Sequence, residues 1–97
     1  MENILQLQFD NELPKPGKTG LDWYIFCSVL ELYRNKPILE IGIGNGGSFY
    51  TICSYTNKAW AIDSWQYGWD KKPVEENCAS LNCNVTFVDI ASNEIDP

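Results

Sequence analysis

A glycine-rich turn is the feature of this sequence that most directly suggests a binding site. An apolar run at residues 38–41 leads into Gly42, Gly44 and Gly46, and a stretch of helical pattern follows. Glycines between a strand and a helix let the backbone turn sharply and contact a flat or extended cofactor. An ordinary glycine-rich connection is the alternative. The spacing of Gly42, Gly44 and Gly47 also fits the G-x-G-x-x-G dinucleotide fingerprint, so the glycines alone leave the cofactor open.

Three acidic residues stand at or near the ends of expected strands. Glu40 precedes the turn, Asp63 follows Gly42 by 21 residues, and Asp89 ends a third apolar stretch. The carboxyl ends of parallel strands lie along one edge of a sheet, so these acids are expected to line one crevice. Glu40 would repel a pyrophosphate and attract an ammonium or sulfonium group, whereas Asp63 can accept the hydroxyls of a ribose. Solvated charges at strand ends are the alternative interpretation.

The elements that must position these residues follow from hydrophobic periodicity and from proline and glycine breaks. Helices are expected over 21–34, 48–55 and 74–81, and strands over 38–42, 58–63 and 84–90. This alternation predicts an α/β fold, a Rossmann-like three-layer sandwich with about three parallel strands and flanking helices. Residues 1–20 are predicted to form an irregular arm, and residues 21–97 a single domain.

The segments LEIGIGNGGS, AIDSW and NVTFVDI together resemble the first half of a class I S-adenosylmethionine-dependent methyltransferase. The resemblance implies that the glycine-rich segment holds the methionine part of the cofactor, that Asp63 binds the ribose, and that Asp89 faces the adenine. Residues beside these acids are implied to contact or cover the adenine. The implied cofactor-binding residues are Glu40, Gly42, Gly44, Gly46, Asp63, Ser64, Trp65, Asp89 and Ile90.

The resemblance covers about residues 21–90 and leaves out part of the family's sheet. Such methyltransferases usually continue through four more strands, so the chain is expected to be a truncated, cofactor-binding half. The first strand would then have an uncovered edge in a small domain with little stability to spare. A homo-oligomer, most simply a two-fold dimer, or a partner chain that completes the sheet is therefore expected.

The sequence supports an enzyme and a binding module without choosing between them. S-adenosylmethionine-dependent methyl transfer is one function, and binding of that cofactor or a related nucleoside without transfer is another. An NAD-binding fragment is a third. No catalytic residue is identified, since Asp70, Glu75 and Glu76 read as surface charges. Trp65, Tyr67 and Trp69 can form a lid over the site or brace an oligomer contact.

The composition of the chain excludes several partners and kinds of catalysis. Seven Lys and Arg against 13 Asp and Glu give a net charge of −6, which argues against nucleic acid or an anionic membrane as partner. The chain has no histidine, which excludes His-based catalysis and His metal sites. Cys78 and Cys83 are separated by four residues, too far for a metal knuckle, and no metal is expected. No apolar run is long enough to span a membrane, and the chain opens without a leader pattern, so a cytoplasmic protein is expected.

Overall fold

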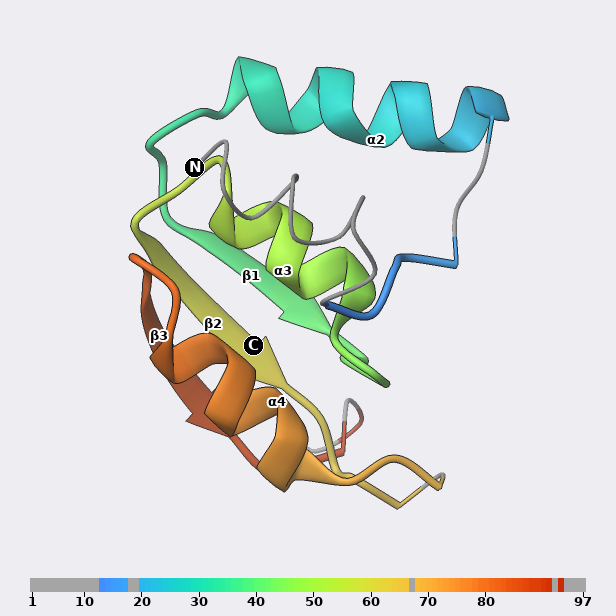
Figure 1. Ribbon diagram of the computed structural model, residues 1–97, viewed down its shortest axis with the longest axis vertical. Coiled ribbons are helices and arrows are strands. Elements are labelled where there is room, and N and C mark those ends of the chain that lie inside the picture. Colours follow the sequence, from blue (N-terminus) through green and yellow to red (C-terminus); the bar gives the residue numbers. More distant parts are fainter. Residues whose placement is uncertain (1–12, 18–19, 67, 92, 94–97) are drawn as a thin grey trace.

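The computed structural model describes residues 13–17, 20–66, 68–91 and 93, which form a three-stranded parallel sheet with three helices (Figure 1). In chain order the elements are α2 (Gly20–Leu32), β1 (Ile38–Ile41), α3 (Gly47–Cys53), β2 (Lys58–Ile62), α4 (Lys71–Ala79) and β3 (Asn84–Val88). The strand order in the sheet is β1-β2-β3, and both strand pairs are parallel. The α/β, Rossmann-like fold with flanking helices that the sequence predicts is therefore confirmed.

The predicted element boundaries are shifted where local chemistry sets a different start or end. Helix α4 begins at Lys71 instead of residue 74, because Pro73 lies in the first helical turn, where its missing N–H has no acceptor to lose. Helix α2 ends at Leu32, and Asn35 soon afterwards has a positive φ of 65°. Strand β1 ends one residue before Gly42, whose φ of 82° turns the chain away from the sheet.

One face of the sheet packs against the helices. The register places Ile38 beside Ala59 and Ala59 beside Val85, and it places Ala61 beside Phe87. Since paired residues in register lie on the same face, these five side chains form one surface. All five belong to or pack against the hydrophobic core that also contains buried residues of α2, α3 and α4. The three helices therefore share a single core with this face.

The opposite face of the sheet carries apolar side chains of β1 that are open to solvent, whereas the register also places Lys58, Asn84 and Thr86 on this face. Leu39 and Ile41 of β1 alternate with the core-facing residues, and they are 52% and 50% exposed. In the described part of the chain β1 pairs with β2 alone, so β1 is an edge strand of this sheet.

Helix α3 lies at the centre of the core. Six of its seven residues are buried, and the Tyr50 hydroxyl accepts a hydrogen bond from Asn77 Nδ2 of α4 at 2.9 Å. Residues 13–17 of the predicted arm have no regular structure but pack against this region. Leu13 is buried in the core, and a Cβ at Gly47 would overlap the Lys15 carbonyl group. Residues 1–12, 18 and 19 of the arm lie outside the described residues.

Two features of the described residues concern membranes and metal ions. No helix in this part of the chain is long and apolar enough to cross a membrane. Among the same residues, no group of three or more His, Cys, Asp or Glu side chains is placed to hold a metal ion. The four cysteines are free thiols: Cys27, Cys53, Cys78 and Cys83.

Shortening the fully buried Phe49 tests whether the α3 core carries the stability of the fold. We expect Phe49→Ala to lower the free energy of unfolding by about 3–5 kcal/mol, because it removes an aromatic ring and leaves a cavity. Glu76→Ala, at an exposed side chain on α4, is the control and should cost less than about 0.5 kcal/mol. Urea unfolding followed by circular dichroism measures both, and equal losses would contradict this account of the core.

Candidate functional site

The glycine-rich turn connects the end of β1 to the start of α3. Gly42, Gly44 and Gly46 have φ values of 82°, 60° and 90°, in the left-handed region that other residues rarely adopt. A Cβ at Gly46 would lie 2.5 Å from the Tyr50 ring, so this glycine is also required by packing. A Cβ at Gly42 would meet nothing within 4 Å, and its backbone faces open space. The glycines of this pattern therefore serve different purposes: Gly46 is required by packing against Tyr50, whereas Gly42 leaves its backbone open to a ligand.

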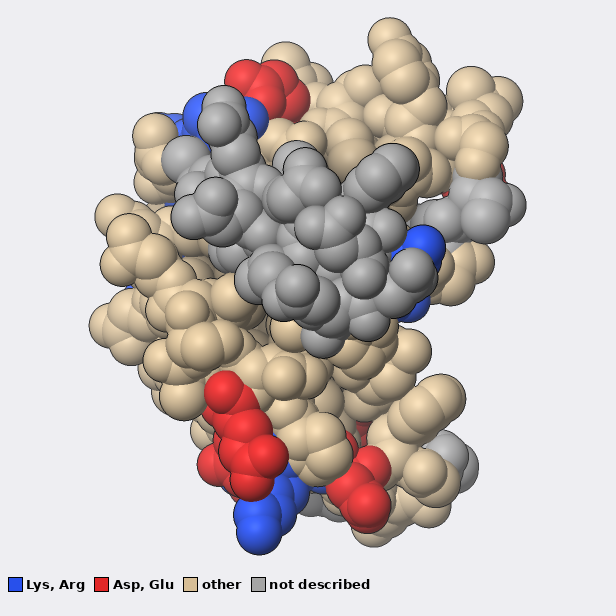
Figure 2. All heavy atoms as spheres, in the orientation of Figure 1, with Lys and Arg blue, Asp and Glu red and all other residues tan. Residues whose placement is uncertain are grey.

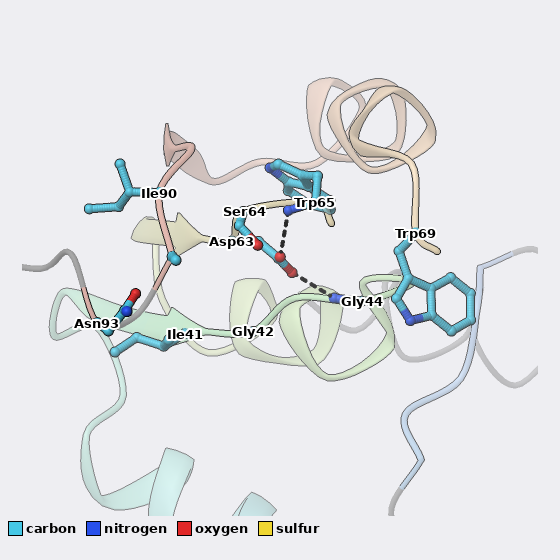
Figure 3. Close-up of a pocket in the computed structure, with 10 residues that line it drawn as sticks. Ile41, Gly42, Gly44, Asp63, Ser64, Trp65, Trp69, Ile90 and Asn93 are labelled. Carbon is cyan, nitrogen blue, oxygen red and sulfur yellow. Dashed lines mark hydrogen bonds between the residues drawn. The ribbon is translucent and has the colours of Figure 1, made fainter. Parts of the chain in front are cut away.

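Asp63, directly after β2, holds this turn in place. Its Oδ2 accepts hydrogen bonds from the backbone N–H groups of Ile43 at 2.7 Å and Gly44 at 3.2 Å. Its Oδ1 accepts one from Trp65 N–H at 2.9 Å (Figure 3). A carboxylate has about four acceptor positions, so most of its capacity is used by the protein's own backbone. The residue predicted to bind a ribose therefore stabilises the glycine-rich turn through these hydrogen bonds.

These contacts also fix the charge of Asp63. Partial burial favours the neutral acid, but the N–H donors of Trp65, Ile43, Gly44 and Ser64 outweigh it and lower the pKa of Asp63 below its ordinary value. The carboxylate is therefore ionised at neutral pH.

A pocket of about 450 Å³ opens at the carboxyl ends of the strands, beside the Asp63 carboxylate. Its lining comes from the ends of β1 and β2, the loop after β2 and the segment after β3. The ten lining residues are Ile41, Gly42, Gly44, Asp63, Ser64, Trp65, Trp69, Ile90, Ala91 and Asn93. Figure 3 shows Trp69 beside the glycine-rich turn and Ile90 and Asn93 on the other side of the pocket.

The structure gathers most of the predicted site residues around this pocket, but not all of them. Six of the nine line it: Gly42, Gly44, Asp63, Ser64, Trp65 and Ile90. Glu40, Gly46 and Asp89 are not among its lining residues. Glu40 is half-buried, and the register places it beside Ala61 on the core-facing side of the sheet.

Asp89 contacts the pocket wall instead of the pocket. Its carboxylate accepts hydrogen bonds from Trp65 Nε1 at 3.1 Å and from Lys71 Nζ at 2.6 Å. The Lys71 ammonium, helped by the Trp65 indole, lowers the pKa of Asp89 and keeps it charged. The ion pair joins the end of β3 to the start of α4, and the indole bond orients Trp65. Asp89 thus acts on the site through Trp65.

Sequence reasoning missed four lining residues as members of the binding set. Trp69 belongs to the aromatic loop that was considered a lid, and it crosses the turn: a Cβ at Gly44 would lie 3.6 Å from Trp69 Nε1. Ile41 is adjacent to the first glycine and could have been found on that ground. Ala91 and Asn93 belong to no recognisable pattern, and Tyr67 of the aromatic loop lies outside the described residues.

Comparison of the chain with models of protein families, with curated proteins and with solved structures gives no match. The resemblance to class I methyltransferases therefore rests on the three sequence segments.

Replacing the Asp63 carboxylate by an amide tests its role in the stability of the fold. We expect Asp63→Asn to lower the free energy of unfolding at pH 7 by about 1–3 kcal/mol, because charged hydrogen bonds to backbone N–H groups are weakened. Asp70→Asn is the matched control, since the Asp70 side chain makes no cap hydrogen bond and should have a much smaller effect. Urea unfolding of the three proteins provides the comparison.

The difference in the free energy of unfolding between the wild type and Asp63→Asn should depend on pH. The pKa of Asp63 is lowered in the folded state, so its charge stabilises the fold above the unfolded-state pKa of about 3.9. This contribution is lost as the pH falls below that value and through the folded-state pKa. The difference between the wild type and Asp63→Asn should therefore shrink from about pH 4 downward. A difference that stays constant with pH would show that the carboxylate charge is not what holds the turn.

Proposed function

We propose that this chain binds S-adenosylmethionine at the carboxyl ends of β1 and β2, as the cofactor-binding unit of a methyltransferase. The observation that carries the proposal is the ionised Asp63 carboxylate fastened across the Gly42–Gly44 turn, inside one pocket with two tryptophans. The three sequence segments that resemble class I methyltransferases supply the two strand ends and the segment after β3 that border this pocket.

The size and lining of the pocket fit such a ligand. Its volume of about 450 Å³ lies within the range of small-molecule sites. The open backbone at Gly42 admits close approach of an extended chain. Trp65, Trp69 and Ile90 provide flat and apolar surface for a planar base. Because backbone N–H groups already use the acceptor positions of Asp63, we infer that a ribose hydroxyl approaches the carboxylate beside its longest contact, the 3.2 Å bond from Gly44 N–H.

The charge of the lining favours a cationic ligand over a dinucleotide. Asp63 is the only one of the ten lining residues that ionises, and none of the ten is Lys or Arg. A pyrophosphate would therefore meet a negative charge with no basic side chain to offset it, whereas a sulfonium with an ammonium group would be attracted. This supports S-adenosylmethionine over NAD independently of Glu40, which does not line the pocket.

The bound cofactor would supply a methyl group on a sulfonium: an acceptor nucleophile would bond to the methyl carbon as the carbon–sulfur bond breaks, and the neutral thioether would be the leaving group. The chain's part is to hold and orient: the glycine-rich turn and Asp63 fix one end of the site, and Trp65 and Trp69 form its walls. Asp63, the only ionisable group among the ten lining residues, is committed to backbone N–H donors. None of these residues is therefore free to act as a general base, and the acceptor would need a nucleophile that requires no deprotonation by the pocket. The same observation favours a second function, binding of the cofactor without methyl transfer. The free thiols support a reducing compartment such as the cytoplasm.

Titration calorimetry tests the proposed ligand. S-adenosylmethionine and S-adenosylhomocysteine should bind to the chain, and NAD should not, because of the uncompensated Asp63 charge. Trp69→Ala should weaken binding by about 0.5–1.5 kcal/mol, the usual contribution of an aromatic contact beyond its area. Trp69 is 52% exposed, so its removal should leave the fold intact.

Tyr33→Ala is the control for that variant, because Tyr33 is an aromatic residue of similar exposure that does not line the pocket. Equal or tighter binding of NAD would overturn the assignment. Unchanged affinity in Trp69→Ala would move the ligand away from this pocket.

A further inference from the structure

Helix α2 is apolar on the side that faces the core and on the side that faces away from it. Leu30 is buried and Phe26 packs against the core, while Trp23 stacks on Phe26 with ring centroids 5.9 Å apart. The outward side carries large apolar residues that are between 48% and 80% exposed. These residues, which we name the outer stripe, are Leu21, Tyr24, Ile25, Val29 and Leu32. A helix that is apolar all round is normally covered on both sides.

The charges on and beside α2 argue for a protein as the covering partner. The helix itself carries Asp22 and Glu31 and no Lys or Arg, and the net charge of the chain is −6. Glu31 is already paired with Arg34 at 2.6 Å. Figure 2 shows a surface over α2 that is largely uncharged in this view. Anionic lipid and nucleic acid both require basic residues, which this face lacks.

The spacing along the outer stripe suits a second copy of the same helix. Leu21, Ile25 and Leu32 of the stripe, with the exposed Ser28 between them, follow one another at intervals of four, three and four residues, the spacing of a helix–helix seam. When two such helices are antiparallel about a two-fold axis, Leu21 lies opposite Leu32 of the other copy, and Ile25 lies opposite Ser28. A large side chain thus meets a small one at the middle of the contact, so the stripe is complementary to itself.

Ser28 can be buried in this contact without leaving an unsatisfied donor. Its hydroxyl donates a hydrogen bond to the Tyr24 carbonyl of the same helix at 2.8 Å. A hydroxyl that is satisfied within its own helix costs little to remove from water. The small polar residue at the centre of the stripe is therefore compatible with close helix packing.

The exposed apolar area is sufficient for a weak dimer. The five side chains of the outer stripe and neighbouring Tyr33 expose on the order of 100 Å² each, or on the order of 600 Å² per copy. A specific interface buries about 800 Å² per partner, so an association that exchanges at micromolar concentration is expected. The edge of β1, the other surface expected to be covered, offers only Leu39 and Ile41 on a strand of four residues.

We propose that two copies of this chain associate through the outer stripe of α2, antiparallel about a two-fold axis. The interface is separate from the pocket, since no residue of the stripe lines it. The proposal therefore stands or fails independently of the proposed cofactor.

Sedimentation equilibrium of the full chain tests this interface between about 5 and about 500 μM. The mass should rise from 11.1 kDa toward twice that value. Ile25→Glu and Leu32→Glu should each weaken the association at least about tenfold, because each buries a charge in the seam. Both side chains are at least half exposed, and circular dichroism checks that both variants fold. Leu39→Glu is the control on β1 and should leave the dissociation constant unchanged.

A folded wild type that remains at 11.1 kDa over the whole concentration range would overturn the proposal. So would loss of association in Leu39→Glu with retention in Ile25→Glu and Leu32→Glu, since the interface would then lie at β1. A mass that continues to rise beyond a dimer would exclude the closed two-fold arrangement.

Discussion

The hydrogen bonds between the Asp63 carboxylate and the glycine-rich turn are the interaction on which the site and this end of the sheet depend. A turn made with positive φ angles leaves the N–H groups of Ile43 and Gly44 without partners inside a helix or strand, and Asp63 supplies the acceptor. The carboxylate is within reach because β1 and β2 are parallel and the ladder continues past β1, with Gly42 N–H donating to the Ile62 carbonyl at 2.8 Å. One contact thus closes the fold at this edge and shapes the pocket.

The sequence allowed the fold and the core of the site to be predicted, because both depend on short-range patterns. The alternation of apolar runs with helical stretches gives the order of elements, and parallel pairing then brings Asp63 to the glycine-rich turn. The period-two alternation of a strand would also have placed Glu40 on the same side as Ile38, toward the core. That signal was present but was outweighed by the position of Glu40 next to the turn.

The parts of the site that could not be predicted depend on contacts between distant segments. Asp89 is held by Lys71 at the start of α4 and by the Trp65 indole, and neither partner follows from the pattern of β3. The position of Trp69 over Gly44 depends on the path of the loop between β2 and α4. Asn93 borders the pocket only because the chain turns back after β3. Such contacts are set by tertiary packing, which a single sequence does not encode at a recognisable spacing.

The contact between Gly47 and the Lys15 carbonyl couples two segments that are far apart in the sequence. A side chain at position 47 has no room while residues 13–17 follow their present path, and that path in turn places Leu13 in the core. The residue type at position 47 is therefore limited by the backbone path of residues 13–17, whatever side chain stands at position 15. In related sequences, a residue other than glycine at position 47 should occur together with a different route for this segment, so the glycine reports on the course of the preceding chain.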